Sequence, residues 1–496
     1  MPDDSEMESG TKPLDRKDGP PARNADSVDR KEGPADPTQP RAVTGDVVTR
    51  LAGWGKYPVV KARVRRPEKI AALADLVAMS SGSSLLARGL GRSYGDASMN
   101  MQGRTVLMER LNRMIAFNAK TGILRCEAGV TFHDILEVFV PRGWFPAVTP
   151  GTKFVTMGGA AAFDVHGKNH HRNGSFSNFI ESLTVLLASG EMVRCSRTQY
   201  SDLFWATIGG MGLTGVITEM EVVLRPIETA YIKALTIKAK SLDEAFALFD
   251  EHEPRYQYSV AWIDCLAGGA SLGRSVVMFG NHASPADLPH RMQAEPFRTR
   301  RKIQMRVPFD LPSFVLNRHT ASAFNALYYK IQADGQEDSI DDFNSFFYPL
   351  DGLLEWNRVY GPRGFVQYQC VFPPDVSREA LVRLLEMCSK KGLGSFLAVL
   401  KRFGRQDGWM QFPMPGYTLA MDIPMRPTLL PVLDEMDQLV LQYGGRVYLA
   451  KDARMSPESF RAMYPGYPKW LEFKARVDPS GIFSSALSER LRIHTR

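Results

Sequence analysis

The sequence predicts an α+β fold with two or more packed units. The chain has 496 residues, which is more than one hydrophobic core usually serves. Its apolar fraction of 44% and charged fraction of 23% are ordinary for a globular enzyme. Short strand-like segments are mixed with helical ones without a regular βαβ rhythm, which disfavours a doubly wound sheet.

The N-terminal half is expected to hold short strands and amphipathic helices. Residues 1–40 are rich in Pro, Asp, Arg and Lys, and we expect a disordered leader there. Apolar residues at helical spacing predict one helix within 64–79, with Pro67 near its start, and another at 132–140. Alternating segments predict strands at 84–87, 106–108, 123–127 and 216–224, and a hairpin made of 183–187 and 191–195.

After Pro226 the segments become longer. Strands are predicted at 231–239, 364–372 and 417–423, and helices at 242–251, 378–390 and 429–443. This alternation predicts a second unit built on an antiparallel sheet that helices cover. The segment 297–306 is basic with interleaved apolar residues. Two interpretations of it stay open: a solvated loop, or a surface that docks on anionic lipid or a phosphate headgroup.

Composition narrows the classes of function. A net charge of +7 favours an anionic partner such as a nucleotide cofactor, a phosphorylated substrate or an acidic membrane surface. We do not expect nucleic acid, because neither zinc-finger spacing nor an RNA-binding aromatic signature occurs. Five scattered cysteines without a CxxC pair predict buried reduced thiols. The sequence shows neither a signal peptide nor a membrane-spanning run, so we expect a cytoplasmic protein, with peripheral contact at the inner membrane surface left open.

The first candidate for binding chemistry is the glycine-rich stretch Arg88–Asp96. Its three closely spaced glycines, with Arg88 and Arg92 beside them, let the backbone approach a polyanion. Glycines kept purely for turns are the alternative. The order Gly-Leu-Gly-Arg-Ser-Tyr-Gly does not match GxGxxG, so a nicotinamide-binding Rossmann domain is disfavoured.

A second candidate segment runs from Pro150 to His171. It begins with small and hydroxylated residues that could lie along a bulky planar ligand, and it ends in Asp-Val-His-Gly-Lys-Asn-His-His. A metal site is disfavoured because the adjacent His170 and His171 cannot easily point to one place. A cofactor-lined cleft, where His and Lys meet an anionic or hydroxylated substrate, suits the segment better. A third glycine-rich segment at 204–216 precedes a strand.

These three segments, in this order, resemble the vanillyl-alcohol oxidase/p-cresol methylhydroxylase-type FAD-binding family. With Glu355-Trp-Asn-Arg-Val-Tyr-Gly-Pro and Ala450-Lys-Asp added, the chain is similar, over residues 46–490, to the polyprenyl-phosphoryl-ribose oxidases within it. The resemblance implies a two-subdomain FAD-binding domain at 41–230, a substrate domain at 231–446 and a return to the FAD domain at 447–496.

The resemblance also implies which residues hold FAD. Many relatives in the broader fold attach FAD through a histidine in the first glycine loop, whereas this chain has Ser93 and Tyr94 there, so we expect non-covalent FAD. The residues assigned to FAD are Ala87, Arg88, Gly89, Leu90, Gly91, Arg92, Ser93, Tyr94, Pro150, Gly151, Thr152, Thr156, Gly158, Gly159, Ala162, His166, Gly215, Ile217, Tyr448 and Lys451.

The activity implied is oxidation of the C2 hydroxyl of a polyprenyl-phosphoryl-β-D-ribose, the first half of epimerisation to an arabinose donor for cell-wall polymers. A separate NAD(P)H-dependent keto-sugar reductase would complete it. The resemblance assigns catalysis to Lys451, His166 and Tyr94, and substrate binding to Lys168, Gln367, Gln369, Lys401 and Lys451. The alternative for Lys451 is a surface ion pair with Asp452.

Two other functions stay open at this point. An aldonolactone or alditol oxidase shares the fold but uses a free sugar and oxygen. A flavin-bearing partner protein without turnover, or a membrane-surface scaffold, would not be reduced by any sugar. The basic segment 297–306 and the pair His166 and Lys168 favour a phosphorylated lipid substrate. Mycobacterial relatives have a cysteine where this chain has Ala420, so a thiol-directed inhibitor should find no nucleophile there.

Overall fold

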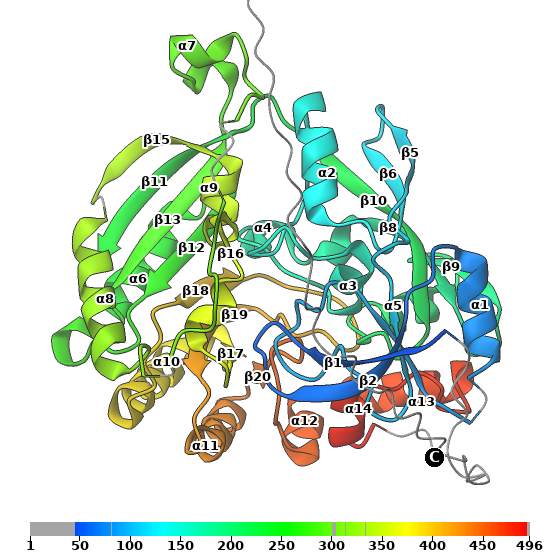
Figure 1. Cartoon of the computed structure of the whole chain (residues 1–496). Coiled ribbons are helices and arrows are strands. Elements are labelled where there is room, and N and C mark those ends of the chain that lie inside the picture. The colour runs from blue at the N-terminus through cyan, green and yellow to red at the C-terminus, as the bar shows by residue number, and fades with distance from the viewer. Residues whose placement is uncertain (1–44, 81, 300–303, 313, 333, 494–496) are drawn as a thin grey trace, which may run out of the picture. The chain divides into compact units, whose positions relative to one another are not determined.

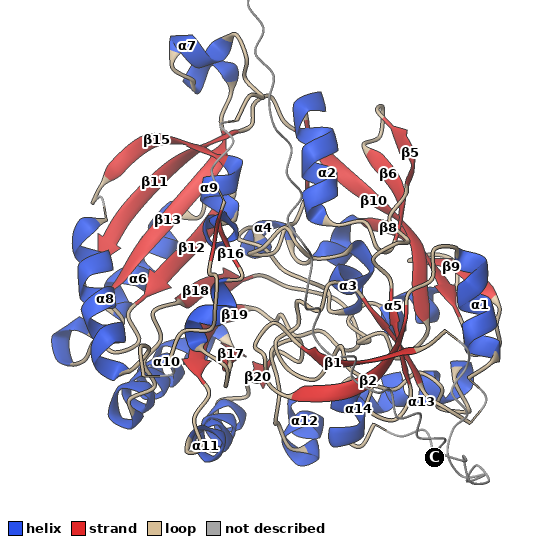
Figure 2. Ribbon diagram, in the orientation of Figure 1, coloured by secondary structure: helices blue, strands red, loops and turns tan. Residues whose placement is uncertain are grey.

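The fold is organised by three larger sheets that follow one another along the chain. A computed structural model describes residues 45–493 except 81, 300–303, 313 and 333. The predicted leader 1–40 and part of the basic segment 297–306 lie outside the described residues. Strands and helices are mixed throughout the described chain, so the predicted α+β class is confirmed (Figures 1 and 2).

The first sheet positions the glycine-rich stretch. Its strands are, in spatial order, β1 (Val47–Ala52), β2 (Val59–Arg65), β4 (Arg104–Leu107) and β3 (Leu85–Arg88). Strands β2 and β3 both run parallel to β4, and α1 (Ile70–Ala78) connects them while burying Leu73, Leu76 and Val77. Parallel strands end at the same edge of a sheet, so the loop that begins at Gly89 leaves from a carboxyl edge.

The second sheet is antiparallel, in the order β5-β6-β10-β8-β9, with β7 beside β10. Its strands are β5 (Met114–Asn118), β6 (Ile123–Glu127), β7 (Trp144–Pro146), β8 (Ile180–Leu186), β9 (Met192–Ser196) and β10 (Val216–Pro226). Strands β8 and β9 form the predicted hairpin. The helices are α2 (Phe132–Phe139), η1 (Val140–Arg142), α3 (Met157–Ala162), α4 (His170–Asn173), η2 (Phe176–Phe179) and α5 (Ser201–Thr207). Helix α2 begins where predicted because Thr131 and Asp134 form a capping box.

The third sheet is also antiparallel and has the order β15-β11-β13-β12-β18-β19-β17-β20. Its strands are β11 (Tyr231–Ala239), β12 (Tyr258–Ile263), β13 (Ser275–His282), β15 (Gln336–Asp342), β17 (Phe365–Phe372), β18 (Ala398–Phe403), β19 (Gly416–Pro424) and β20 (Arg446–Val447). Helices α6 (Leu242–His252), α10 (Pro374–Lys391) and α11 (Leu429–Gln442) pack against it. The predicted helix-covered antiparallel sheet is therefore present (Figure 2).

Shorter elements connect the strands of this sheet. They are η3 (Gly269–Ser271), η4 (Pro285–Asp287), α7 (His290–Gln293), β14 (Met305–Arg306), α8 (Arg318–Ile331), α9 (Phe343–Phe347), η5 (Pro349–Gly352), β16 (Leu353–Leu354) and η6 (Trp356–Tyr360). Strand β14, which ends the basic segment, pairs with β16.

Alternation along the strands divides the third sheet into two faces. On β17, Tyr368 and Cys370 belong to the main hydrophobic core, whereas Gln367 and Gln369 face a cavity. Neighbouring strands follow the same rule, because successive side chains of a strand point to opposite faces. The sheet thus packs one face into the core and presents the other to the cavity.

The end of the chain returns to the first half through α12 (Pro457–Met463), α13 (Tyr467–Val477) and α14 (Ala486–Arg490). The Trp470 indole donates to the carbonyl oxygen of Ala206 at 2.8 Å, and the buried Lys474 amine donates to that of Leu213 at 2.9 Å. All five cysteines are free and buried, as predicted. Among the described residues, no helix combines the length and apolar character that a membrane span requires.

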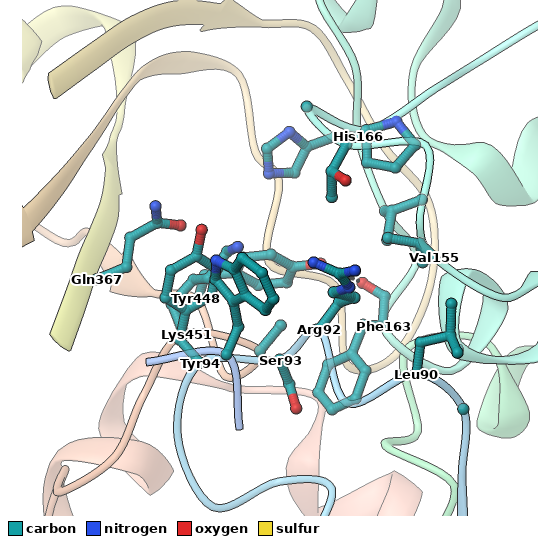
Figure 3. A pocket seen from close by; sticks show the side chains of 18 of the residues that line it. Leu90, Arg92, Ser93, Tyr94, Val155, Phe163, His166, Gln367, Tyr448 and Lys451 are labelled. Atoms are coloured by element: carbon teal, nitrogen blue, oxygen red, sulfur yellow. Dashed lines mark hydrogen bonds between the residues drawn. The ribbon is translucent and has the colours of Figure 1, made fainter. Parts of the chain in front are cut away.

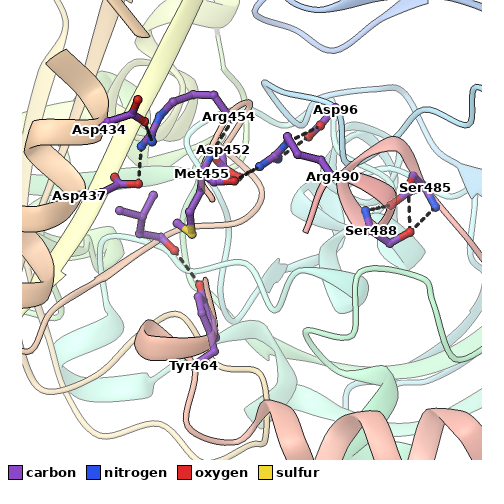
Figure 4. Close-up of polar contacts among 11 residues, drawn as sticks. Asp96, Asp434, Asp437, Asp452, Arg454, Met455, Tyr464, Ser485, Ser488 and Arg490 are labelled. Atoms are coloured by element: carbon purple, nitrogen blue, oxygen red, sulfur yellow. Dashed lines mark hydrogen bonds and ion pairs between the residues drawn. The ribbon is translucent and has the colours of Figure 1, made fainter. Parts of the chain in front are cut away.

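A charged cluster ties the return to the glycine-rich stretch (Figure 4). The Arg490 guanidinium donates to both oxygens of Asp96, at 2.8 and 2.9 Å, and to Asp452 at 2.8 Å. Asp96 closes the glycine-rich stretch, and Asp452 follows Lys451. The backbone N–H of Tyr94 also donates to the carbonyl oxygen of Ala450 at 2.9 Å. These bonds fix the distance between two segments far apart in the sequence.

We expect Arg490→Ala to destabilise the protein by about 3–5 kcal/mol, because two buried carboxylates lose their cation. Denaturant unfolding followed by circular dichroism measures the effect. Arg378→Ala is the matched control, since Arg378 pairs with Asp243 in an exposed ion pair and its loss should change little. Equal unfolding midpoints for the two variants would contradict this role of Arg490.

Candidate active site

A cavity of ≈ 390 Å³ lies where the first sheet, the α3 region and the third sheet meet. Figure 3 shows its polar groups: Tyr94 and Lys451 gather on one side with Gln367 beside them, and His166 lies across the opening. Every residue that the resemblance assigned to FAD, to the substrate or to catalysis lines this cavity. The structure therefore brings all of these predicted positions together, while their individual roles stay predictions.

The glycine loop is shaped by close backbone packing. A Cβ at Gly89 would lie 2.2 Å from Thr156 Oγ1, and Gly91 has a φ of +63°, which favours glycine. The buried Arg88 guanidinium donates to the carbonyl oxygens of Ala52 (2.6 Å) and Ser98 (2.9 Å). Arg88 therefore ties the glycine loop to the neighbouring backbone at Ala52 and Ser98. The sequence pattern did not indicate this role.

The segment leading into α3 forms the facing wall. The Thr156 side chain accepts from Gly159 N–H at 3.3 Å and caps the helix. A Cβ at Gly158 would lie 2.8 Å from Ala128 Cβ, so only a bare backbone fits there. In contrast, a Cβ at Gly151 or Gly212 would meet nothing within 4 Å, so these backbone positions face open cavity.

Positive charge dominates the lining. Five cations line the cavity, and Asp351 is the one acid among the described lining residues; the cations are Arg88, Arg92, Lys168, Lys401 and Lys451. Burial lowers the pKa of Lys168 to about 7 and that of Lys401 to about 8. A bound anion would restore the protonated form of these amines.

Hydrogen-bond directions around His166 constrain Lys401. Thr418 Oγ1 donates to the Cys370 carbonyl oxygen (2.8 Å) and accepts from Gln369 Nε2 (3.2 Å). The same amide nitrogen lies 3.1 Å from His166 Nε2, which must then accept. Burial holds the pKa of His166 well below its usual value, so the neutral ring carries its proton on Nδ1, 3.2 Å from the Lys401 amine. The Lys401 amine can accept a hydrogen bond from this N–H only when the amine is neutral.

Lys451 lies inside the cavity. Its Nζ is 3.9 Å from the centre of the Tyr94 ring. Burial lowers the pKa of Lys451, and the charge of Asp422 opposes that shift. Asp422 is fully buried and accepts from Gln367 Nε2. The alternative of a surface pair with Asp452 is wrong, because the Lys451 amine lies over the Tyr94 ring inside the cavity and the buried Asp452 pairs with Arg490.

An apolar extension of the cavity was not predicted from the sequence. It is lined by Val260, Trp262, Met278, Tyr328, Phe347, Leu350, Trp356, Leu397 and Val399. Strand alternation could have placed several of these on one face, but it gives no sign of which face is hollow. Trp54, also missed, stacks under Arg92, with the guanidinium carbon 4.1 Å from its ring centre.

The remaining histidines of the cluster point elsewhere. His170 is buried beside Ser175 Oγ at 3.1 Å, and Nδ1 of His171 lies 3.3 Å from Ser259 Oγ. Ala420 lines the cavity, and no cysteine does so in the described chain. A thiol-directed inhibitor is therefore still expected to find no nucleophile there.

Comparisons with known proteins agree with this geometry. The FAD binding domain model matches residues 61–196, and the D-arabinono-1,4-lactone oxidase model matches residues 417–491. The chain is 37% identical over 450 residues to the decaprenylphosphoryl-β-D-ribose oxidase of Mycolicibacterium smegmatis, covering 90% of this chain and 97% of that protein. It is 34% identical over 371 residues to an uncharacterized protein of Streptomyces coelicolor, covering 73% and 100%. It is 20% identical over 487 residues to mouse L-gulonolactone oxidase, covering 89% and 98%.

The residues of the cavity fit FAD. Glycine backbone lines a cradle: an added Cβ at Gly89 or Gly158 would collide with the wall, and one at Gly151 or Gly212 would enter the open cavity. Ser93 Oγ is buried at the cradle and has no hydrogen-bond partner within the described structure, so a ligand oxygen could satisfy it. Arg92 adds a cation for a pyrophosphate.

We expect Gly158→Val to abolish FAD binding, because its side chain would collide with Ala128 and push the wall into the cradle. The ratio of flavin absorbance to protein absorbance of the purified protein measures this. Gly352→Ala is the control, since an added Cβ there meets nothing within 4 Å and Gly352 does not line the cavity. A normal flavin content in folded Gly158→Val would contradict the cradle.

Proposed function

The chain belongs to the decaprenylphosphoryl-β-D-ribose oxidase family of FAD-dependent oxidoreductases, and we propose that it oxidises the C2 hydroxyl of a polyprenyl-phosphoryl-β-D-ribose to the 2-keto sugar. This reaction is the first half of epimerisation to an arabinose donor for cell-wall polymers. The observation that carries the proposal is the cavity itself, which joins a glycine cradle, three lysine amines and an apolar extension.

We assign the parts of the substrate to parts of the cavity. Lys168 and Lys401 are the candidates for the phosphate, because both line the cavity and Asp351 is the one carboxylate among its described lining residues. The apolar extension beside Trp262 and Tyr328 suits the first units of the prenyl chain. A free sugar would leave both regions unused.

Lys451 is proposed to act on the C2 hydroxyl. Bound FAD supplies the acceptor for the hydride that leaves C2. The neutral Lys451 amine can take the hydroxyl proton, and its ammonium form can hold the developing oxyanion. Asp422 lies behind Lys451 and favours the charged form, so it is proposed as a positioning residue. Tyr94 lies against the same amine and orients it.

His166 is proposed to orient the sugar and the phosphate together. Its two ring nitrogens face Gln369 and Lys401, both assigned to the substrate. The aromatic rings of Phe403 and Tyr448 lie 4.7 and 5.5 Å from its ring and hold it in place. A change in the protonation of Lys401 would therefore change the hydrogen bonding of His166 and, through it, that of Gln369.

The proposed division follows from these assignments. Residues 41–230 would hold FAD, residues 231–446 the substrate, and residues 447–496 would return Lys451 to the FAD side. The keto sugar must then be reduced, so an NAD(P)H-dependent keto-sugar reductase is the proposed partner. Contact with the inner face of a membrane is proposed because the substrate carries a prenyl chain.

A second candidate is a lactone oxidase, which the match of the D-arabinono-1,4-lactone oxidase model to residues 417–491 favours. Anaerobic mixing with polyprenyl-phosphoryl ribose or with arabinono-1,4-lactone separates the two. We expect the flavin absorbance to bleach with the phosphorylated lipid alone. Bleaching by the lactone, with none by the lipid, would replace the proposal.

Lys451→Ala should keep FAD and slow flavin reduction by substrate about 10²–10⁴-fold, the range of a lost general acid or base. Stopped-flow absorbance under anaerobic conditions measures the rate. Lys469→Ala is the control, because Lys469 lies against Trp409 outside the cavity. A normal reduction rate in Lys451→Ala would remove this residue from the chemistry.

Substrate affinity should fall as pH rises through about 7 to 8. The phosphate diester stays anionic, while Lys168 and Lys401 lose their protons over this range. Binding above it must therefore take up protons, at a cost of up to about tenfold in affinity per pH unit for each amine. Calorimetry in buffers with different ionisation enthalpies measures the uptake. Lys401→Met should lower it, and uptake that is absent or unchanged by this variant contradicts the assignment.

The FAD is proposed to be non-covalent, because Ser93 and Tyr94 occupy the loop where many relatives have a histidine. Acid or heat precipitation should release free FAD into the supernatant. Yellow colour that stays with the precipitated protein would show a covalent link.

A further inference from the structure

One face of α8 is apolar and exposed although the helix is firmly anchored. On its inner side Asn325 is buried, and its Nδ2 donates to Asp264 at 2.8 Å and to the Ser395 carbonyl oxygen at 3.1 Å. On its outer side Leu327 is 58% and Ile331 65% exposed. In Figure 1, α8 lies at the outer edge of the third sheet.

The exposed residues form one stripe. Phe324, Leu327 and Ile331 are three and four residues apart, which places them on the same side of a helix. Phe314, just before the helix, is 77% exposed. The helix has no acidic residue, and the exposed cation Lys330 lies beside Leu327 and Ile331. An apolar stripe accompanied by cations is typical of helices that lie in the interface of an anionic bilayer.

The stripe is continuous with the substrate cavity. The Phe324 ring, 45% exposed, stacks on Tyr328 with ring centres 5.9 Å apart. Tyr328 in turn contacts Trp262 at 4.7 Å, and both line the apolar extension. A row of aromatic rings therefore leads from the exposed face of α8 into the cavity.

We propose that the exposed face of α8 docks on an anionic lipid bilayer, so that the prenyl chain of the substrate passes along Phe324 and Tyr328 without entering water. The inference rests on the proposed function for the identity of the prenyl chain. The bilayer docking itself rests on the stripe, the neighbouring cation and the aromatic row. Leu327 and Ile331 insert into the acyl boundary, and Lys330 meets lipid phosphates.

Vesicle co-sedimentation of the FAD-loaded full chain tests the docking without any substrate. Wild type should bind vesicles that contain phosphatidylglycerol more tightly than vesicles of phosphatidylcholine alone. The double variant Leu327→Glu/Ile331→Glu should bind the anionic vesicles at least about tenfold more weakly, because two inserted side chains become charged. Met192→Glu makes the same kind of change on β9 and should bind as wild type does.

Activity provides the second readout. The double variant should oxidise a water-soluble short-chain prenyl-phosphoryl ribose at the wild-type rate, which shows that it is folded. It should oxidise the long-chain substrate in vesicles about tenfold more slowly or worse. If wild type binds anionic vesicles through α8 but no prenyl-phosphoryl ribose reduces its flavin, the proposed substrate fails and the docking surface stands.

Three results would overturn the docking surface. The first is wild-type vesicle binding by the double variant, and the second is no binding of anionic vesicles by wild type. The third is a wild-type dimer, seen by analytical ultracentrifugation, that the double variant abolishes while vesicle binding is unchanged. The stripe would then serve a second copy of the chain.

Discussion

Five cations and one acid line the cavity in the described structure, and burial makes this excess of positive charge costly. Burial lowers the pKa of all three lysine amines, and the Arg88 guanidinium donates to backbone carbonyl oxygens. We propose that ligands balance the remaining positive charge: the FAD pyrophosphate beside the glycine loop and the substrate phosphate beside the third sheet. In this proposal the cofactor and the substrate supply the negative charge that the lining of the cavity lacks.

This cavity exists because three separate parts of the chain are held in register. The glycine loop leaves the carboxyl edge of the first sheet, and one face of the third sheet lies opposite this loop across the cavity. The return segment supplies Lys451 and is fixed by Arg490, which bonds to Asp96 and Asp452. Tyr94 and Lys451 meet as a direct result. The geometry of the cavity therefore depends on residues 447–493 as much as on the glycine loop.

Local patterns predicted much of the fold, because each element carries its own signal. Strand β11 was predicted with its observed bounds, and α2 starts at its capping box. The cofactor and site positions came from motif resemblance. What the sequence could not give depends on contacts between distant segments. It did not show that Arg88 bonds to the backbone next to the glycine loop, or that Trp262 and Tyr328 line the cavity. Nor could it tell which residue pairs with Asp452, because that partner is Arg490, far along the chain.

Hydride transfer from C2 is tested by a substrate that carries deuterium on C2 of the ribosyl ring. If the cavity holds C2 for hydride transfer with Lys451 at its hydroxyl, the label slows flavin bleaching and is lost from the keto sugar. Deuterium on C3 should leave the rate unchanged. Equal bleaching rates for C2-deuterated and unlabelled substrate, with the label retained at C2 in the product, would show that C2 is not the carbon that is oxidised.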